Sequence, residues 1–106
     1  METITIKRDN DADLRFAGEV VADASSVHEM RTGKSTGRWC ELTLYRTRGG
    51  RYVCAQIGHT QWEGERKRHT AAVCDDEAAV IEFFGHGWLA KDLYKAAGIV
   101  DALDVE

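Results

Sequence analysis

Residues 38–60 read RWCELTLYRTRGGRYVCAQIGHT and predict two β-strands joined at Gly49-Gly50. Apolar and polar residues alternate on both sides of the glycines, which is the period of a half-buried strand. A two-residue turn is expected there, because the twist of such a turn matches the twist of the flanking strands. The register that follows places Leu44 opposite Ala55, Leu42 opposite Ile57, and Tyr45 opposite Cys54.

This register assigns the side chains of the hairpin to two faces, because successive residues of a strand point to opposite sides. The apolar face, which we expect in the core, holds Leu42, Leu44, Val53, Ala55 and Ile57. The other face is amphipathic and holds Trp39, Thr43, Tyr45, Thr47 and Tyr52.

Three further strands are expected around this hairpin. Residues 3–8 and 13–23 precede it and residues 69–73 follow it, each with apolar residues at every second position. In the second of these strands, one face is expected to hold Leu14, Phe16, Val20 and Ala22. Gly18 is expected to mark a β-bulge in the same strand. The polar residues 24–37 are expected to form the most mobile loop.

The period changes to that of helices after the last strand. Asp75 or Asp76 can cap a first helix, which is expected to end at Gly85. A second helix is expected at about 88–97 and is expected to end at Gly98. Its inward side is expected to hold Leu89, Leu93 and Trp88.

Strands first and helices last predict an α+β fold. We expect an antiparallel sheet of about five strands, in the order β-β-β-β-β-α-α, with the two C-terminal helices packed on one face. A chain of 106 residues has the size of one domain. Residues 1–106 are therefore expected to form a single domain around one core.

The composition is that of an ordinary globular protein. The chain has no apolar run long enough to span a membrane, no secretory signal at its start, and three cysteines without paired spacing. These features predict a cytoplasmic protein with reduced thiols.

The charge is distributed unevenly along the chain. Its net charge is −4, but residues 31–69 are basic, with nine basic and three acidic side chains. The acidic ends either neutralise this block across the folded surface or leave it free for partners.

The chain contains two cysteines and two histidines of the kind that bind zinc, and these are Cys54, His59, His69 and Cys74. If the strands that carry them are paired, the cysteines point to one side of the sheet and the histidines to the other. Four side chains on two faces cannot converge on one ion, so we expect no metal site.

No catalytic signature stands out in the chain. Residues 33–35 read GKS, the end of a phosphate-binding loop, but the required earlier glycine is replaced by His28 and a strand follows instead of a helix. No nucleophile motif is present. The sequence therefore predicts a protein that is not an enzyme and has no cofactor.

A basic and aromatic surface is the strongest candidate site. Its expected members are Arg38, Trp39, Tyr45, Arg46, Arg48, Arg51, Tyr52, Arg66, Lys67 and Arg68. Arginine, tyrosine and tryptophan carry most of the energy at protein interfaces. The same set suits nucleic acid, with arginines on phosphates and aromatic rings stacked on bases. A plainer alternative is that Trp39 and Tyr45 only cover the second face of the sheet.

These features predict a small non-enzymatic binding protein that acts through a protein–protein interface. In size and in its lack of a catalytic motif, the chain is similar to small inhibitors of host defence found on phages and plasmids, including anti-CRISPR proteins. This likeness covers no particular residue. The alternative function is a nucleic-acid-binding regulator that uses residues 38–52. A pI of about 5.5 weighs against it, because phosphate neutralisation is the main source of affinity for nucleic acid.

Overall fold

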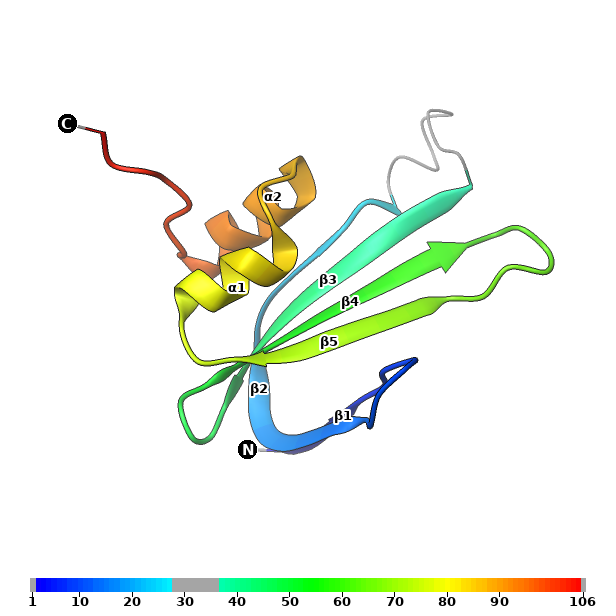
Figure 1. Ribbon diagram of the computed structural model, residues 1–106, viewed down its shortest axis with the longest axis horizontal. Coiled ribbons are helices and arrows are strands. Elements are labelled where there is room, and N and C mark those ends of the chain that lie inside the picture. Colours follow the sequence, from blue (N-terminus) through cyan, green and yellow to red (C-terminus); the bar gives the residue numbers. More distant parts are fainter. Residues whose placement is uncertain (1, 28–36, 106) are drawn as a thin grey trace.

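The computed structural model describes residues 2–27 and 37–105, and in these ranges the chain forms five antiparallel strands followed by two helices (Figure 1). The elements are β1 (Glu2–Ile6), β2 (Leu14–Ser25), β3 (Arg38–Thr47), β4 (Tyr52–Thr60), β5 (Arg68–Cys74), α1 (Glu77–Phe84) and α2 (Trp88–Ala97). The α+β class expected from the sequence is confirmed. The loop expected at 24–37 falls mostly outside the described residues, and its first two residues belong to β2.

The strands form one sheet in chain order, and this sheet curls (Figure 1). The curl brings the loop after β1 to the edge of β5. There the backbone N–H of Asp9 donates to the carbonyl oxygen of His69 at 3.1 Å, and the N–H of His69 donates to Asp9 Oδ2 at 2.8 Å. The sheet is therefore partly closed, with one face turned inward and the other face covered by the helices.

A bulge in β2 contributes to this curl, and it lies at Val21 rather than at Gly18 as expected. The pairing with β3 shifts between Val20 and Ala22, so one residue of β2 has no partner in β3. Ala22 consequently turns to the helix-covered face, and the expected common face with Val20 is wrong. Gly18 has another role, because a Cβ at this position would lie 2.5 Å from the carbonyl oxygen of Arg46.

The turn between β3 and β4 has three residues, 48–50, instead of the expected two. The N–H of Thr47 donates to the carbonyl oxygen of Arg51, and the N–H of Gly50 donates to the carbonyl oxygen of Thr47. Gly50 has φ +85°, the left-handed conformation that closes a three-residue hairpin loop. The expected register is therefore wrong by one residue. The observed pairs are Leu44 with Cys54, Leu42 with Gln56, and Tyr45 with Val53.

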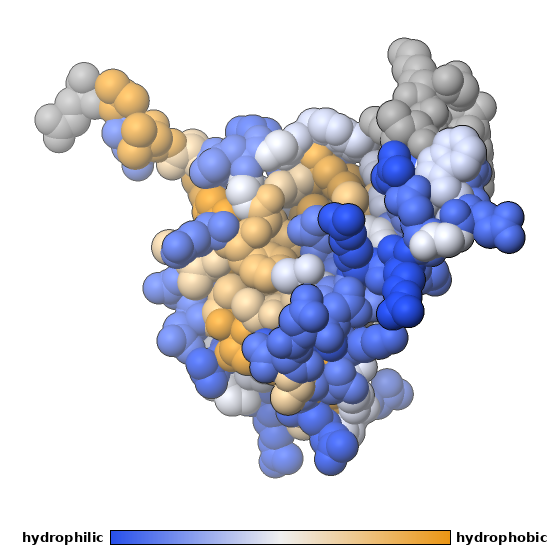
Figure 2. Space-filling model, turned by 45° about the vertical axis from the view of Figure 1, so that its right-hand side comes forward, coloured by the Kyte–Doolittle hydropathy of each residue, from blue (hydrophilic) through white to orange (hydrophobic). Residues whose placement is uncertain are grey.

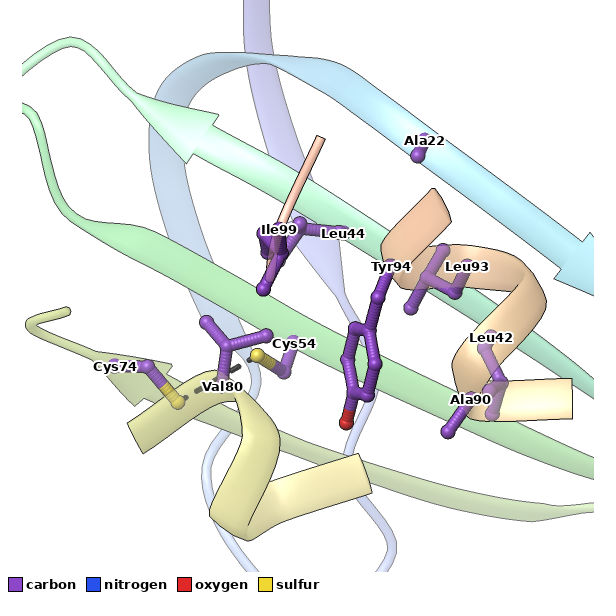
Figure 3. Close-up of a cluster of buried hydrophobic side chains, with 10 residues drawn as sticks. All are labelled: Ala22, Leu42, Leu44, Cys54, Cys74, Val80, Ala90, Leu93, Tyr94 and Ile99. Carbon is purple, nitrogen blue, oxygen red and sulfur yellow. Dashed lines mark hydrogen bonds between the residues drawn. The ribbon is translucent and has the colours of Figure 1, made fainter. Parts of the chain in front are cut away.

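The one-residue shift gives the sheet two apolar faces. The main core lies between the sheet and the helices and consists of Ala22, Leu42, Leu44, Cys54, Cys74, Val80, Ala90, Leu93, Tyr94 and Ile99 (Figure 3). Val53 and Ala55 are buried, as expected, but on the opposite, inward face of the curl. The expected common core face of Leu42, Leu44, Val53 and Ala55 is therefore wrong, because a slip of one residue moves a strand's side chains to the other face.

The helices begin and end as the sequence predicts. The side chain of Asp76 accepts a hydrogen bond from the N–H of Ala79 at 2.8 Å, which caps the start of α1. Gly85 and Gly98 end α1 and α2. Trp88 is 49% exposed, so the expectation that it points inward is wrong. Neither described helix is long and apolar enough to cross a membrane.

Shortening a core leucine should destabilise the fold strongly. Leu44 is fully buried between the sheet and the helices, so Leu44→Ala should lower the free energy of unfolding by about 2–5 kcal/mol. Urea titration followed by circular dichroism measures this change. Val100→Ala is the matched control, because Val100 is 76% exposed and its loss should change stability by less than about 0.5 kcal/mol. Equal losses for the two variants would contradict the described core.

The two core cysteines should react slowly with alkylating reagents. Burial raises the pKa of the Cys54 thiol, and the adjacent Cys74, whose Sγ lies 3.5 Å away, raises it further. The pKa of Cys74 is also raised, mainly by burial. Because the thiolate is the reactive form, iodoacetamide should modify the partly exposed Cys40 first. Mass spectrometry of peptides from the native protein would show this order, and equal labelling of all the cysteines would contradict it.

Candidate partner-binding surface

Apart from Tyr45, the residues expected to bind a partner divide into two groups at opposite ends of the β3–β4 hairpin (Figure 1). The group at the β3–β4 turn is Arg46, Arg48, Arg51 and Tyr52. The group at the other end is Arg38, Trp39, Arg66, Lys67 and Arg68, with the last three in or next to the β4–β5 loop. Eight residues of extended strand separate Arg38 from Arg46, which corresponds to about 27 Å. A single compact patch of all these residues does not form.

The aromatic residues of the set also lie on different faces. Tyr45 pairs with Val53 and so faces inward, whereas Tyr52 pairs with Arg46 on the helix-covered face. The expectation that the two tyrosines share a face is therefore wrong. The ring of Tyr45 lies 5.4 Å from that of Phe16 in an edge-on contact, and burial raises the pKa of its phenol. Tyr45 thus packs inside the curl, which agrees with the plainer alternative for this residue.

Two arginines at the turn have partners within the protein. Arg51 Nε lies 2.7 Å from Asp75 Oδ1, in an exposed ion pair. The guanidinium of Arg46 lies 5.2 Å from the centre of the Tyr52 ring and donates to the Tyr52 hydroxyl at 3.1 Å. These contacts add little stability at an exposed site, but they occupy the charged groups.

An arginine–glutamate pair joins β3 to the β4–β5 loop at the other end. Arg38 Nη2 donates to Glu65 Oε1 at 2.7 Å, and Arg38 Nε donates to Glu65 Oε2 at 3.1 Å. This bidentate pair fixes the orientation of the two side chains as well as the distance between them. Next to it, Trp39 stacks on His59 with ring centres 5.0 Å apart and an angle of 7° between the planes. The loop is therefore held against the sheet on one side.

A hollow of about 990 Å³ lies beside this loop. We call it the basic hollow, and its lining residues are Lys7, Asp9, Asn10, Glu65, Arg66, Lys67, Arg68, His69 and Thr70. Within the described parts of the chain, Lys7, Arg66, Lys67 and Arg68 form no ion pair. Strongly hydrophilic residues cover this side of the molecule in Figure 2. These four cations outnumber the two carboxylates of the lining, Asp9 and Glu65, so the hollow carries an excess of positive charge.

Sequence reasoning missed the contribution of the residues after β1. Lys7, Asp9 and Asn10 are about sixty positions from the β4–β5 loop in sequence, and the curl of the sheet brings them to it. Asp9 uses its Oδ2 to accept the N–H of His69. No local pattern marks these residues, because their position depends on the closure of the sheet as a whole.

The cysteines and histidines considered as metal ligands lie on the two faces of the sheet that the alternation of side chains along a strand predicts. Cys54 and Cys74 face the helices, whereas His59 and His69 face inward. His59 is 9% exposed, and its Nε2 lies 3.0 Å from Glu41 Oε1 without the alignment of a hydrogen bond. Residues 2–27 and 37–105 contain no group of three or more His, Cys, Asp or Glu side chains placed to hold a metal ion.

A second charged cluster ties the chain after α2 to the helices. Asp101 Oδ1 lies 2.7 Å from His86 Nδ1, and Asp101 Oδ2 lies 3.2 Å from Lys91 Nζ. Burial acts to raise the pKa of Asp101, but hydrogen bonds and charge from Lys91 and His86 outweigh burial and lower the pKa below its usual value. The cluster holds residue 101 against His86, which lies between the helices, and against Lys91 of α2.

Neither a protein-family model, nor a curated protein, nor a solved structure matches this chain. A functional proposal therefore rests on the geometry described above. Within that geometry, the basic hollow has the densest group of positively charged side chains.

The Asp101 cluster makes a pH-dependent contribution to stability. Because the pKa of Asp101 is lower in the folded state than in the unfolded state, its contribution is fully present above about pH 4 and is lost as pH falls through the folded pKa. Asp101→Asn should be less stable than the wild type at pH 7, and the difference should shrink in acid. Thermal unfolding at pH 7 and at about pH 2.5 measures it. An equal difference at both values would contradict the assignment.

Proposed function

We propose that this protein is a non-enzymatic binding protein that docks an acidic surface of a partner protein on the basic hollow. Occupation of the partner's surface would itself be the activity, which is how a small inhibitor of a larger complex works. The proposal keeps the class of function expected from the sequence. It moves the interface away from the β3–β4 turn and toward the β4–β5 loop.

The observation that carries the proposal is the group of four cations without an ion pair among the described residues, gathered around one concave surface. Lys7 follows β1, Arg66 and Lys67 lie in the β4–β5 loop, and Arg68 is the first residue of β5. Charge gathered in a concave site strengthens the local potential and speeds the encounter with an oppositely charged partner. At the turn, by contrast, Arg51 is already paired with Asp75.

The surroundings of the hollow also favour an interface, because two contacts hold its walls. The Arg38–Glu65 pair fixes the loop to β3, and the hydrogen bonds between Asp9 and His69 fix the other wall to β5. Walls held in this way lose less conformational entropy when a partner binds.

Nucleic acid is the second candidate partner, because the same cations suit phosphates and Trp62 in the β4–β5 loop is 50% exposed. The carboxylates of Asp9 and Glu65 in the hollow would repel a phosphate backbone and an acidic protein surface alike, so they do not separate the two candidates. The acidic pI of about 5.5 weighs against nucleic acid, because phosphate neutralisation is the main source of affinity for it. The two candidates differ in the effect of nuclease and in the dependence of affinity on salt.

Reversal of the charge of the hollow should abolish partner capture. The test variant carries Arg66→Glu, Lys67→Glu and Arg68→Glu, and the control variant carries Arg48→Glu at the exposed turn. Each protein is immobilised and exposed to nuclease-treated lysate of its native cell. The captured protein is then purified and titrated. We expect the triple variant to bind it about 10–100-fold more weakly than the wild type, which corresponds to about 1.4–2.8 kcal/mol.

The control and a second assay complete the experiment. Arg48→Glu should leave the affinity within about twofold, since Arg48 lies in the β3–β4 turn, at the end of the hairpin opposite the β4–β5 loop. A partner that dissociates equally from both variants would place the interface elsewhere. Tight binding of DNA or RNA in a gel-shift titration, with affinity that falls steeply as salt rises, would replace the proposal with the nucleic-acid alternative.

A further inference from the structure

A second concave surface lies on the helix-covered side of the sheet, where the helices leave the strands uncovered. Two hollows of about 300 and 500 Å³ adjoin there, because Ser26, Cys40 and Gln56 line both of them. Cys40 and Gln56 belong to the same face of the sheet as Leu42, so they form a continuous floor. We call the combined surface the helix-side groove.

The two ends of the helix-side groove have different chemistry. The smaller hollow is apolar, with Phe84, Trp88 and Leu89 from the helices beside Leu42 from β3. The larger hollow is lined by Arg38, Arg66 and Arg68 and by one carboxylate, Glu65, and it shares the last three of these charged residues with the basic hollow. Figure 2 shows hydrophobic residues across the middle of the molecule and hydrophilic residues on the side of the β4–β5 loop. A segment that combines apolar and acidic side chains would complement both ends.

The chain itself carries a segment with that chemistry. Residues 100–105 read VDALDV, and Leu103 and Val105 are 89% and 84% exposed. In an extended segment these two side chains point to one side, and Asp104 points to the other. Leu103 and Val105 would then cover the apolar floor, and the negative charge of Asp104 would lie in the positive potential of Arg38, Arg66 and Arg68.

We propose that residues 102–105 of one copy of this chain bind in the helix-side groove of a second copy, and that the exchange is reciprocal. Asp101 is held by His86 and Lys91, so the segment leaves the protein from a fixed point. In Figure 1 it then runs away from the helices and the sheet. This direction favours a groove on another molecule over the groove of the same molecule. A reciprocal exchange also satisfies the two-fold symmetry typical of homodimers.

Sedimentation velocity over a range of concentrations tests the proposal. The wild type should show a monomer–dimer equilibrium. Leu103→Asp in the segment and Trp88→Ala in the groove should each raise the dimer dissociation constant at least about tenfold. Val20→Asp is the matched control, because Val20 is 52% exposed on the other face of the sheet, and it should leave the equilibrium unchanged. Circular dichroism checks that each variant is folded.

A mixture of the two variants gives the most specific readout. Leu103→Asp retains an intact groove and Trp88→Ala retains an intact segment, so a mixed dimer contains one intact contact and should be more stable than either variant alone. A labelled peptide of residues 99–106, IVDALDVE, should bind Leu103→Asp and should dissociate wild-type dimers. This peptide assay replaces the groove variant if Trp88→Ala does not fold.

Three results would overturn the proposal. They are a wild type that stays monomeric at about millimolar concentration, a dimer that Leu103→Asp leaves intact, and a peptide that binds neither protein. A monomeric wild type whose external partner is lost with Trp88→Ala would assign the groove to that partner instead. Arg66 and Arg68 line both surfaces. Leu103→Asp leaves the basic hollow unchanged, and Lys7→Glu with Lys67→Glu leaves the helix-side groove unchanged, so these variants let the function proposed above and the present inference fail separately.

Discussion

The three-residue turn at 48–50 is the constraint on which the rest of the structure depends. Gly50 takes a positive φ there, and the N–H of Thr47 donates to the carbonyl oxygen of Arg51. This geometry places Leu44 opposite Cys54, and every other pair along the two strands follows from it. Because side chains alternate between faces, a turn shorter by one residue would send the side chains of β4 to the wrong side.

The register and the bulge in β2 together give the sheet two buried apolar faces, one under the helices and one inside the curl. Leu44 and Cys54 meet the helices, whereas Val53 and Ala55 line the inside of the curl. The curl then joins Asp9 to His69 and brings the end of β1 to the β4–β5 loop. The basic hollow therefore exists because the sheet closes, although most of its charge comes from one short stretch of sequence.

Local signals in the sequence were sufficient to predict the strands and helices, but not the register in which the strands pair. The alternating pattern predicted the strands, and Asp76, Gly85 and Gly98 predicted the helix ends, because caps depend on a few neighbouring residues. The register could not be predicted in this way. Gly49-Gly50 fits both a two-residue and a three-residue loop, and which one forms depends on the burial of whole strand faces.

The candidate site was predictable only in part for the same reason. The run Arg66-Lys67-Arg68 is visible in the sequence, and the structure places it around a hollow. The assignment of Tyr45 and Tyr52 to one face followed from the wrong register and failed with it. Lys7 could not be found, since it reaches the hollow through pairings that span the sheet.

The register of the central hairpin is the claim on which both proposed surfaces depend, and nuclear magnetic resonance of the folded protein tests it most directly. Cross-strand backbone Overhauser contacts should connect Leu44 with Cys54 and Tyr45 with Val53, as the pairing requires. Contacts that instead connect Leu44 with Ala55 and Tyr45 with Cys54 would show a two-residue turn. That result would contradict the two buried apolar faces, the curl and the surfaces built on them.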